Sequence, residues 1–144
     1  MNILLDTNII LDILLKRAPH FQFSYDILAR AEELELVCFL SATAVTDIHF
    51  LLRKSGLSDE LSRTALHQIM SLVQLADVRS DDIQRALHGK MSDFEDAVAA
   101  EIAHRLKCDR IVTRNIRDFA GSPVPALTPA DLIQELVRDC SSPD

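Results

Sequence analysis

The sequence has few of the residues that are typical of flexible or low-complexity chains. It contains three glycines, one tyrosine and no tryptophan in 144 residues, and no repeat or low-complexity tract. With 48% hydrophobic and 26% charged residues, this composition excludes a disordered chain and predicts a compact globular one. The length is enough for a substantial hydrophobic core, and we expect one domain over residues 1–144.

Cysteines and long hydrophobic runs are also scarce. The three cysteines, Cys38, Cys108 and Cys140, are an odd number without metal-ligand spacing, which argues against disulfides and against a zinc site. Asp6 and Asp12 interrupt the apolar N-terminal stretch before it reaches the length of a signal or membrane helix. We therefore expect a cytoplasmic protein with no membrane segment.

Positive charge is in short supply. The 15 Lys and Arg residues against 22 Asp and Glu residues give a net charge of −7. An ordinary nucleic-acid binder carries a basic face that neutralises phosphates, so this balance argues weakly against one. A phosphate-containing substrate would require a metal ion or a local basic patch.

Short apolar runs alternate with amphipathic segments along the chain. The run Ile3-Leu4-Leu5 is too short for a helix and has no polar alternation, which predicts a strand buried on both faces of a parallel sheet. Further strands are predicted at 36–40, 72–78 and 110–113, with an extended piece at 124–127. Helices are predicted at about 9–16, 21–35, 45–52, 58–69, 80–88, 93–107 and 129–138. SDFE at 92–95 has the form of a capping box, with Ser92 as N-cap and Glu95 three residues on. This order predicts an α/β fold with a central parallel sheet and helices on both of its faces.

Acidic and amide side chains recur where the predicted strands end. In such folds ligands bind outside the carboxyl ends of the strands. Four separated segments contribute candidates there: Asp6, Asp47, Asp93 with Asp96, and Asn115 with Asp118. Converging carboxylates raise each other's pKa unless a cation lies among them, and Mg²⁺ or Mn²⁺ prefers such oxygen ligands. Because such an ion can activate water for attack on phosphorus, the pattern predicts metal-assisted phosphodiester hydrolysis.

Each candidate also has an ordinary structural explanation. Asp6 could only cap the first helix, and Asp93 could only complement a helix dipole. Thr113 ends a strand, where a β-branched core residue is a better interpretation than a hydroxyl that orients a ligand. Arg114 and Arg117 flank the acidic loop, where they either hold RNA phosphates or are solvated surface residues.

Three motifs resemble those of the PIN-domain family, a small ribonuclease fold that includes VapC-type toxins: DTNIILD, SATAVTDIHFLLRK and SDFEDAVAAEIAHRLKCDRIVTRNIRDF. The resemblance covers nearly the whole chain. It implies a three-layer α/β/α sandwich of Rossmann-like character, a Mg²⁺ or Mn²⁺ cofactor and endonucleolytic cleavage of RNA. It also implies a toxin held inactive by a cognate antitoxin, and the family favours homodimers.

The resemblance also assigns roles to residues. It implies the catalytic acids Asp6, Asp47 and Asp96 and the metal ligands Asp6, Asp93, Asp96 and Asp118. We predict supporting or substrate-binding roles for Asn8, Thr113, Arg114, Asn115 and Arg117. Two positions depart from the family pattern. Asp47 has a shorter arm than the glutamate common there, and Asn115 replaces an acid and contributes no charge, so Asp118 would substitute for it.

Two other functions compete with the nuclease. A covalent phosphoaspartate enzyme of the haloacid-dehalogenase type would need a second aspartate at the position of Asn8, and a lysine after a late strand, so we disfavour it. A catalytically inactive PIN-fold module that binds a protein partner is the stronger alternative. Asn115, the short Asp47 and the negative net charge favour that alternative.

Overall fold

The computed structural model describes residues 1–142 and contains a five-stranded parallel sheet, as the alternation of strands and helices predicts. The strand order is β3-β2-β1-β4-β5. The strands are β1 (Asn2–Leu5), β2 (Val37–Ser41), β3 (Gln74–Ala76), β4 (Arg110–Val112) and β5 (Ala126–Leu127). The helices are α1 (Thr7–Leu14), α2 (Phe21–Ala29), α3 (Ala42–Lys54), α4 (Asp59–Met70), α5 (Ser80–His88), α6 (Phe94–Arg105) and α7 (Pro129–Ser141), with a 3-10 helix η1 (Ile116–Phe119).

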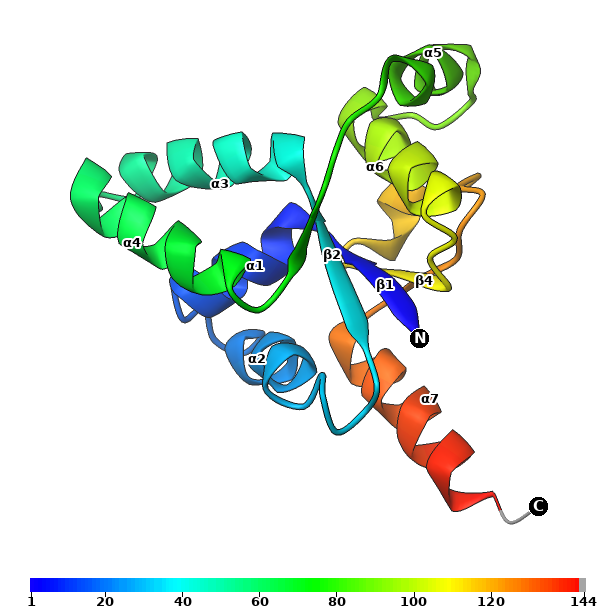
Figure 1. Ribbon diagram of the computed structural model, residues 1–144, viewed down its shortest axis with the longest axis horizontal. Coiled ribbons are helices and arrows are strands. Elements are labelled where there is room, and N and C mark those ends of the chain that lie inside the picture. The colour runs from blue at the N-terminus through cyan, green and yellow to red at the C-terminus, as the bar shows by residue number, and fades with distance from the viewer. Residues whose placement is uncertain (143–144) are drawn as a thin grey trace.

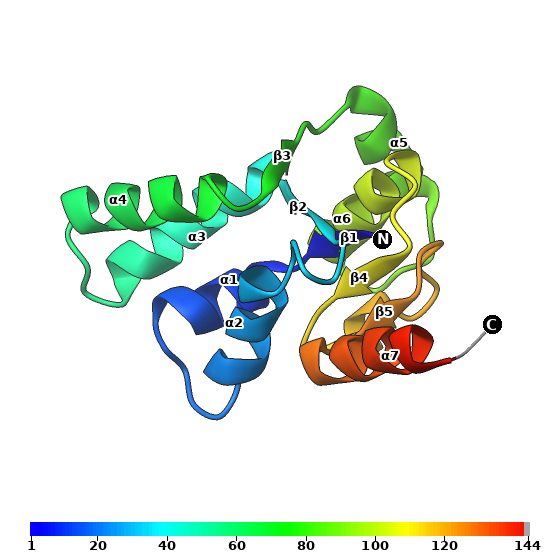
Figure 2. The same ribbon diagram turned by 60° about the horizontal axis from the view of Figure 1, so that its bottom comes forward.

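Two hydrophobic clusters, one on each face of the sheet, give the protein three layers. Successive side chains of a strand point to opposite faces, so Ile3 and Leu5 join the cluster under α1, α2, α3, α4 and α7. Leu4 points the other way and joins the cluster under α5 and α6. Figures 1 and 2 show α1, α2 and α7 on one side of the sheet and α5 and α6 on the other. The predicted α/β/α sandwich is confirmed.

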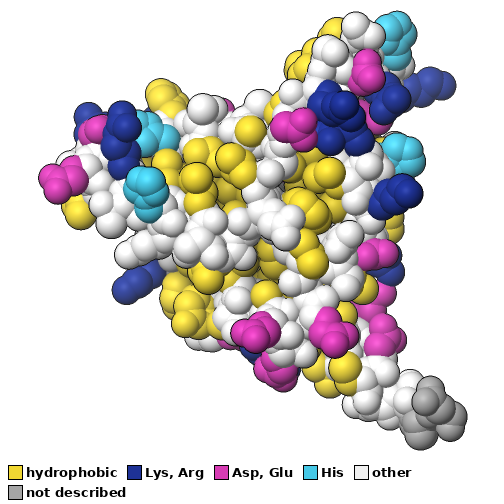
Figure 3. Space-filling view, in the orientation of Figure 1, with side chains coloured by type: hydrophobic (Ala, Val, Ile, Leu, Met, Phe, Trp, Pro, Cys, Tyr) yellow, Lys and Arg dark blue, Asp and Glu magenta, His cyan; other side chains and the backbone are white. Residues whose placement is uncertain are grey.

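Helices α3 and α4 form a hairpin that extends away from the sheet (Figure 2). Gly56, with φ of +101°, closes α3 in a left-handed conformation that favours glycine. Ser58 then caps α4 by accepting a hydrogen bond from the Leu61 N–H at 3.1 Å. Figure 3 shows hydrophobic side chains gathered in the centre of one face of the molecule and charged ones at its corners.

The structure corrects two predicted boundaries. The helix predicted over 21–35 ends at Ala29 and is followed by turns that lead into β2. Ala31 and Leu34 still pack against the core from those turns, so the apolar spacing could not separate a helix from a turn. The strand predicted over 72–78 is only Gln74–Ala76, because this edge strand pairs with β2 over just these residues.

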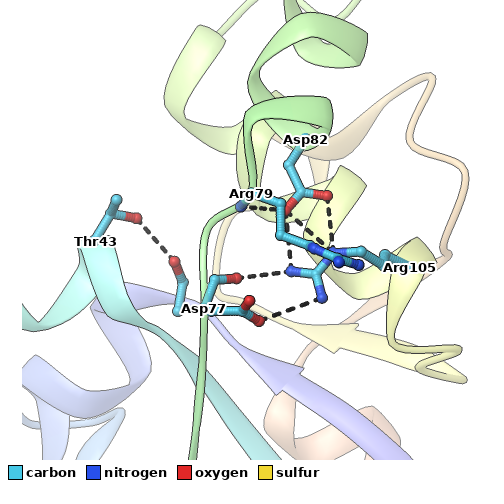
Figure 4. A network of polar contacts seen from close by, with 6 residues as sticks. Thr43, Asp77, Arg79, Asp82 and Arg105 are labelled. Carbon is cyan, nitrogen blue, oxygen red and sulfur yellow. Dashed lines mark hydrogen bonds and ion pairs between the residues drawn. The ribbon is translucent and has the colours of Figure 1, made fainter.

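A buried ion pair anchors the connection between β3 and α5 (Figure 4). Asp82 is fully buried and accepts hydrogen bonds from the Arg105 guanidinium at 3.0 to 3.2 Å and from the Arg79 N–H at 2.9 Å. Arg105 also donates to the Asp77 carbonyl at 2.7 Å. One arginine of α6 therefore holds both the end of β3 and the start of α5.

Within residues 1–142, we find no helix with the length and apolar character that a membrane span requires.

Candidate active site

Asp6 lies at the carboxyl end of β1 and serves two purposes. Its N–H donates to the Val112 carbonyl at 2.9 Å, which holds it beside the end of β4. One carboxylate oxygen, Oδ1, accepts from the Thr7 N–H at 2.8 Å, so Asp6 is the N-cap of α1. The other oxygen, Oδ2, accepts from the Thr113 hydroxyl at 2.7 Å and from Asn8 Nδ2 at 3.3 Å. The capping role and a place in a polar site therefore coexist.

Thr113 connects the first and fourth strand ends. It is fully buried, as expected of a β-branched core residue. Its hydroxyl nevertheless makes the bond to Asp6 and accepts from the Asn115 N–H at 3.0 Å and from Asn8 Nδ2 at 3.4 Å. The core interpretation is therefore right about the burial of Thr113 but misses its hydroxyl, which orients the Asp6 carboxylate.

The start of α6 brings Asp93 and Asp96 to the same edge. The sequence pattern predicts Ser92 as the cap, but the helix begins at Phe94 and Asp93 is its N-cap. Asp93 Oδ1 accepts from the Asp96 N–H at 2.9 Å. Serine and aspartate are both good caps, and the structure uses the one that places Asp96 at the third helical position. Asp93 therefore keeps one carboxylate oxygen free of this bond.

The pKa values of two predicted metal ligands, Asp6 and Asp96, are raised by burial and by the charges of neighbouring acids. Burial raises the pKa of Asp96 to about 7, helped by the charges of Asp6, Asp93 and Asp118. Burial also raises the pKa of Asp6; hydrogen bonds from Thr113 and Thr7 oppose this, whereas the charges of Asp118 and Asp93 add to it. The structure therefore brings four carboxylates within electrostatic reach of each other at one edge of the sheet, called the acidic edge below: Asp6, Asp93, Asp96 and Asp118.

Glu95 is a site residue that the sequence analysis missed. A hydrogen bond with Asp47 raises its pKa to about 7, together with burial and the charges of Asp47, Asp93 and Asp96. Asp47 of α3 therefore contacts Glu95, which follows the site residue Asp93 by two positions, and does not itself join the four acids of the edge. The signal lay in the SDFED segment, where Glu95 was assigned to a capping box that the structure does not form.

Asp12 is the second residue that the sequence analysis gave no role. It is fully buried, and its carboxylate accepts from Arg114 Nε at 2.6 Å and Nη2 at 3.2 Å. The Arg114 backbone N–H also donates to Asn8 Oδ1 at 3.4 Å. Asp12 lies one helical turn after Asn8 in an otherwise apolar helix, and that placement was the available signal. This pairing offsets the charge of Arg114, and its role in holding RNA phosphates stays a prediction.

The η1 segment supplies the remaining predicted residues. Asn115, Arg117 and Asp118 are exposed and line a shallow groove together with Arg114 and Ile116. The Asn115 backbone N–H donates to the Thr113 hydroxyl, and the side-chain amide of Asn115 carries no charge. Arg117 thus remains the exposed cation next to the acidic cluster.

The donor chemistry of this edge fits a hard divalent ion. Asp6, Glu95 and Asp96 line a small cleft with Ser41 and Thr43. In the described part of the chain, no three acidic, histidine or cysteine side chains form a ready-made ligand set. Mutual repulsion keeps carboxylates apart when no cation lies between them, and a cation removes that cost. The acidic side chains of the cleft supply carboxylate oxygens, which Mg²⁺ and Mn²⁺ prefer.

The raised pKa of Asp96 gives a pH-dependent stability. Between its ordinary value of 3.8 and about 7, the folded protein holds a proton that the unfolded chain releases, so stability falls as pH rises through this window. In chelator, we expect Asp96→Asn to melt at a higher temperature than the wild type at pH 8, with the difference vanishing near pH 4. Thermal denaturation from pH 4 to 8 measures this. A variant less stable than the wild type at pH 8 would contradict it.

Comparisons with known proteins agree with this geometry. Residues 2–117 match the sequence model for the PIN domain. None of the curated proteins matches the chain significantly in sequence.

Solved structures with the same fold include toxins and toxin complexes. VapBC2 from Rickettsia felis, bound to a promoter DNA fragment, has a TM-score of 0.69 at 17% identity, covering 89% of this chain and 98% of that one. VapBC-1 from nontypeable Haemophilus influenzae has a TM-score of 0.68 at 17% identity, covering 90% and 99%. VapC20 from Mycobacterium tuberculosis, a sarcin-ricin loop cleaving toxin, has a TM-score of 0.62 at 14% identity, covering 76% and 86%. With the family match over most of its length, the chain belongs to the PIN domain family.

Proposed function

We propose that this protein is a metal-dependent endoribonuclease and the toxin of a type II toxin–antitoxin pair. The observation that carries the proposal is the cluster of Asp6, Asp93, Asp96 and Asp118, whose charges act on one another at one edge of the sheet. Family membership supports a nuclease, and the toxin complexes among the structural neighbours support a toxin.

The side chains of this chain would bind and orient the reacting groups. When bound, Mg²⁺ or Mn²⁺ would supply an activated water and would stabilise negative charge on the phosphoryl oxygens. Asp6, Asp93, Asp96 and Asp118 would hold the ion, and the Thr113 hydroxyl keeps Asp6 in one orientation. Asp47 adjoins the acidic edge through its contact with Glu95, and exposed Arg117 would hold an RNA phosphate.

We also propose a cognate antitoxin, a homodimer and a cytoplasmic location. Large hydrophobic side chains are exposed on α3, on α4 and around β3, and a partner would cover them: Phe50, Leu61, Met70, Leu72 and Leu75. The structural neighbours include a toxin–antitoxin complex from Klebsiella pneumoniae, which supports a protein partner here. Symmetric dimers are the commonest soluble oligomers. All three cysteines carry free thiols, which suits a reducing compartment.

A catalytically inactive PIN module remains the second candidate. The shorter Asp47 and the uncharged Asn115 favour it, because each weakens a position at which many relatives carry a stronger ligand. The two functions differ in metal binding, since a site with too few carboxylates binds Mn²⁺ weakly.

Metal-dependent cleavage tests the proposal. Purified protein is incubated with a panel of transfer, ribosomal and messenger RNAs in Mg²⁺, Mn²⁺ or chelator, and Mn²⁺ binding is measured by calorimetry. We expect site-specific cuts in either metal and none in chelator. Absence of both cleavage and Mn²⁺ binding would instead support the inactive binding module.

A further inference from the structure

A cavity of about 260 Å³ lies next to the candidate active site. Helix α2 contributes Phe23 and Ser24 to its lining, the loop after β4 contributes Arg114 and Asn115, and the start of α7 contributes Pro129. Most of its wall area is apolar, but five of its eight lining residues are polar, and these include His20 and Thr128. Such a mixture is usual for a small-ligand site, although the volume is below the usual range for a drug-sized ligand. The cavity therefore suits one compact group that has an apolar face and a polar edge.

The cavity is coupled directly to the acidic edge. Arg114 and Asn115 line both the cavity and the groove along η1. The Asn115 N–H donates to the Thr113 hydroxyl, which in turn donates to Asp6 Oδ2. A group in the cavity would therefore be held by the same loop that positions the first acid.

Two polar groups of the cavity lining have bonding capacity left over. Ser24 is fully buried, and its hydroxyl has no hydrogen-bond partner within residues 1–142. A buried hydroxyl without a partner costs free energy, which a ligand could recover once the Ser24 side chain rotates its hydroxyl toward the cavity. Arg114 gives Nε and Nη2 to the buried Asp12 carboxylate, so it forms a neutral, rigid pair whose remaining nitrogen can still donate. Neutral donors and acceptors suit the edge of a nucleobase better than a phosphate.

Phe23 supplies a surface for stacking. Its side chain is 48% exposed although it lines the cavity, so one part of the ring is open to a ligand. Unpaired RNA bases stack on aromatic rings and form hydrogen bonds along their edges, whereas paired bases are less accessible to proteins. We propose that the cavity binds one unpaired nucleobase of the RNA next to the cleaved bond and selects the cleavage site; this inference rests on the ribonuclease function proposed above.

Titration with the four ribonucleosides tests the base site separately from catalysis. Nucleosides carry no phosphate, so the acidic edge does not repel them, and the titration is done in chelator with the full-length protein. By two-dimensional NMR, we expect at least one nucleoside to shift the amide signals of Ser24, Asn115 and Ala130, which all line the cavity, in a saturable way. We expect Phe23→Ala to weaken this binding by about tenfold, the typical contribution of one base stack.

Tyr25→Ala is the matched control for Phe23→Ala. Tyr25 lies on the same helix, is 47% exposed and stacks on Phe21 outside the cavity. We expect this variant to bind the nucleosides as tightly as the wild type. Equal losses in the two variants, no saturable shift with any nucleoside, or shifts that map elsewhere would each overturn the proposal. A further outcome is that the amide signals at the cavity respond to no nucleoside and shift only when a co-purifying protein is added. That result would also overturn the nucleobase proposal, in favour of a protein-docking site.

Ser24→Ala tests the hydrogen bond that gives selectivity. The Ser24 hydroxyl has no partner to lose, so the variant should fold as stably as the wild type. We expect it to bind the preferred nucleoside more weakly and the others unchanged, and to cut RNA at a wider set of nucleotides. An unchanged nucleoside preference would remove Ser24 from the base site. If nucleosides bind as expected but no metal supports cleavage, the ribonuclease proposal fails and the nucleobase site stands.

Discussion

Asp6→Asn should lower RNA cleavage by about a thousandfold or more and should leave the protein folded. The substitution removes the charge of the first acid, which lies within electrostatic reach of Asp93 and Asp118. Asparagine is also a good N-cap, so α1 keeps its first hydrogen bond. Burial and neighbouring acids raise the pKa of Asp6, so loss of its charge relieves repulsion and should not lower the melting temperature in chelator.

Cleavage rate, Mn²⁺ affinity and melting temperature together measure this expectation. Asp131→Asn is the matched control, because Asp131 is an exposed acid in the first turn of α7, outside the candidate site. We expect the control to cut RNA at the wild-type rate and to bind Mn²⁺ equally well. An Asp6→Asn protein that cuts as fast as the wild type would refute the assignment of the site. A variant that loses activity because it unfolds would show a lower melting temperature and would refute the claim of relieved repulsion.

The layers and the first acid could be predicted from the sequence because they depend on local pattern. The run Ile3-Leu4-Leu5 is apolar at every position, which occurs when a strand is covered on both faces, and the two hydrophobic clusters divide its side chains in alternation. Asp6 directly follows that run, so its place at the sheet edge needed no tertiary information. The TPAD segment likewise starts α7, where Thr128 accepts from the Asp131 N–H at 3.2 Å.

Pairings between distant charges could not be predicted in this way. Asp12 and Arg114 are separated by 102 positions, and nothing in their local sequences marks them as partners. The same holds for Asp47 and Glu95, which meet only because α3 and α6 approach the same edge. A spacing rule reports which face of a helix a residue occupies, but the partner on the neighbouring helix is set by strand order and crossover geometry.

The structure also implies a large stability effect away from the acidic edge. We expect Asp82→Ala to reduce the free energy of unfolding by about 3 kcal/mol, because removing one partner of a buried pair leaves the other uncompensated. In this variant Arg105 would keep its ion pair with the exposed Asp77. The expected loss of stability is therefore at the lower end of the range for broken buried ion pairs. The exposed neighbour Asp81 is the matched control, and Asp81→Ala should cost about 0.5 kcal/mol, the value of a first-turn charge.

Urea denaturation measures the free energy of unfolding of Asp82→Ala, of Asp81→Ala and of a double variant that adds Arg105→Leu to Asp82→Ala. The double variant separates loss of the Asp82–Arg105 ion pair from loss of the hydrogen bond that Asp82 accepts from the Arg79 N–H at the start of α5. The double variant should recover part of the stability, because no unpaired guanidinium remains.

The stability of Asp82→Ala in acid provides a second criterion. Burial acts to raise the pKa of Asp82, but hydrogen bonds from Arg105 and the Arg79 N–H outweigh it and hold the pKa below the ordinary 3.8. The stabilisation is therefore complete above pH 3.8 and is lost as pH falls further, so the difference between wild type and Asp82→Ala should narrow in acid. Equal losses in Asp82→Ala and Asp81→Ala would show that this ion pair does not hold the β3–α5 connection.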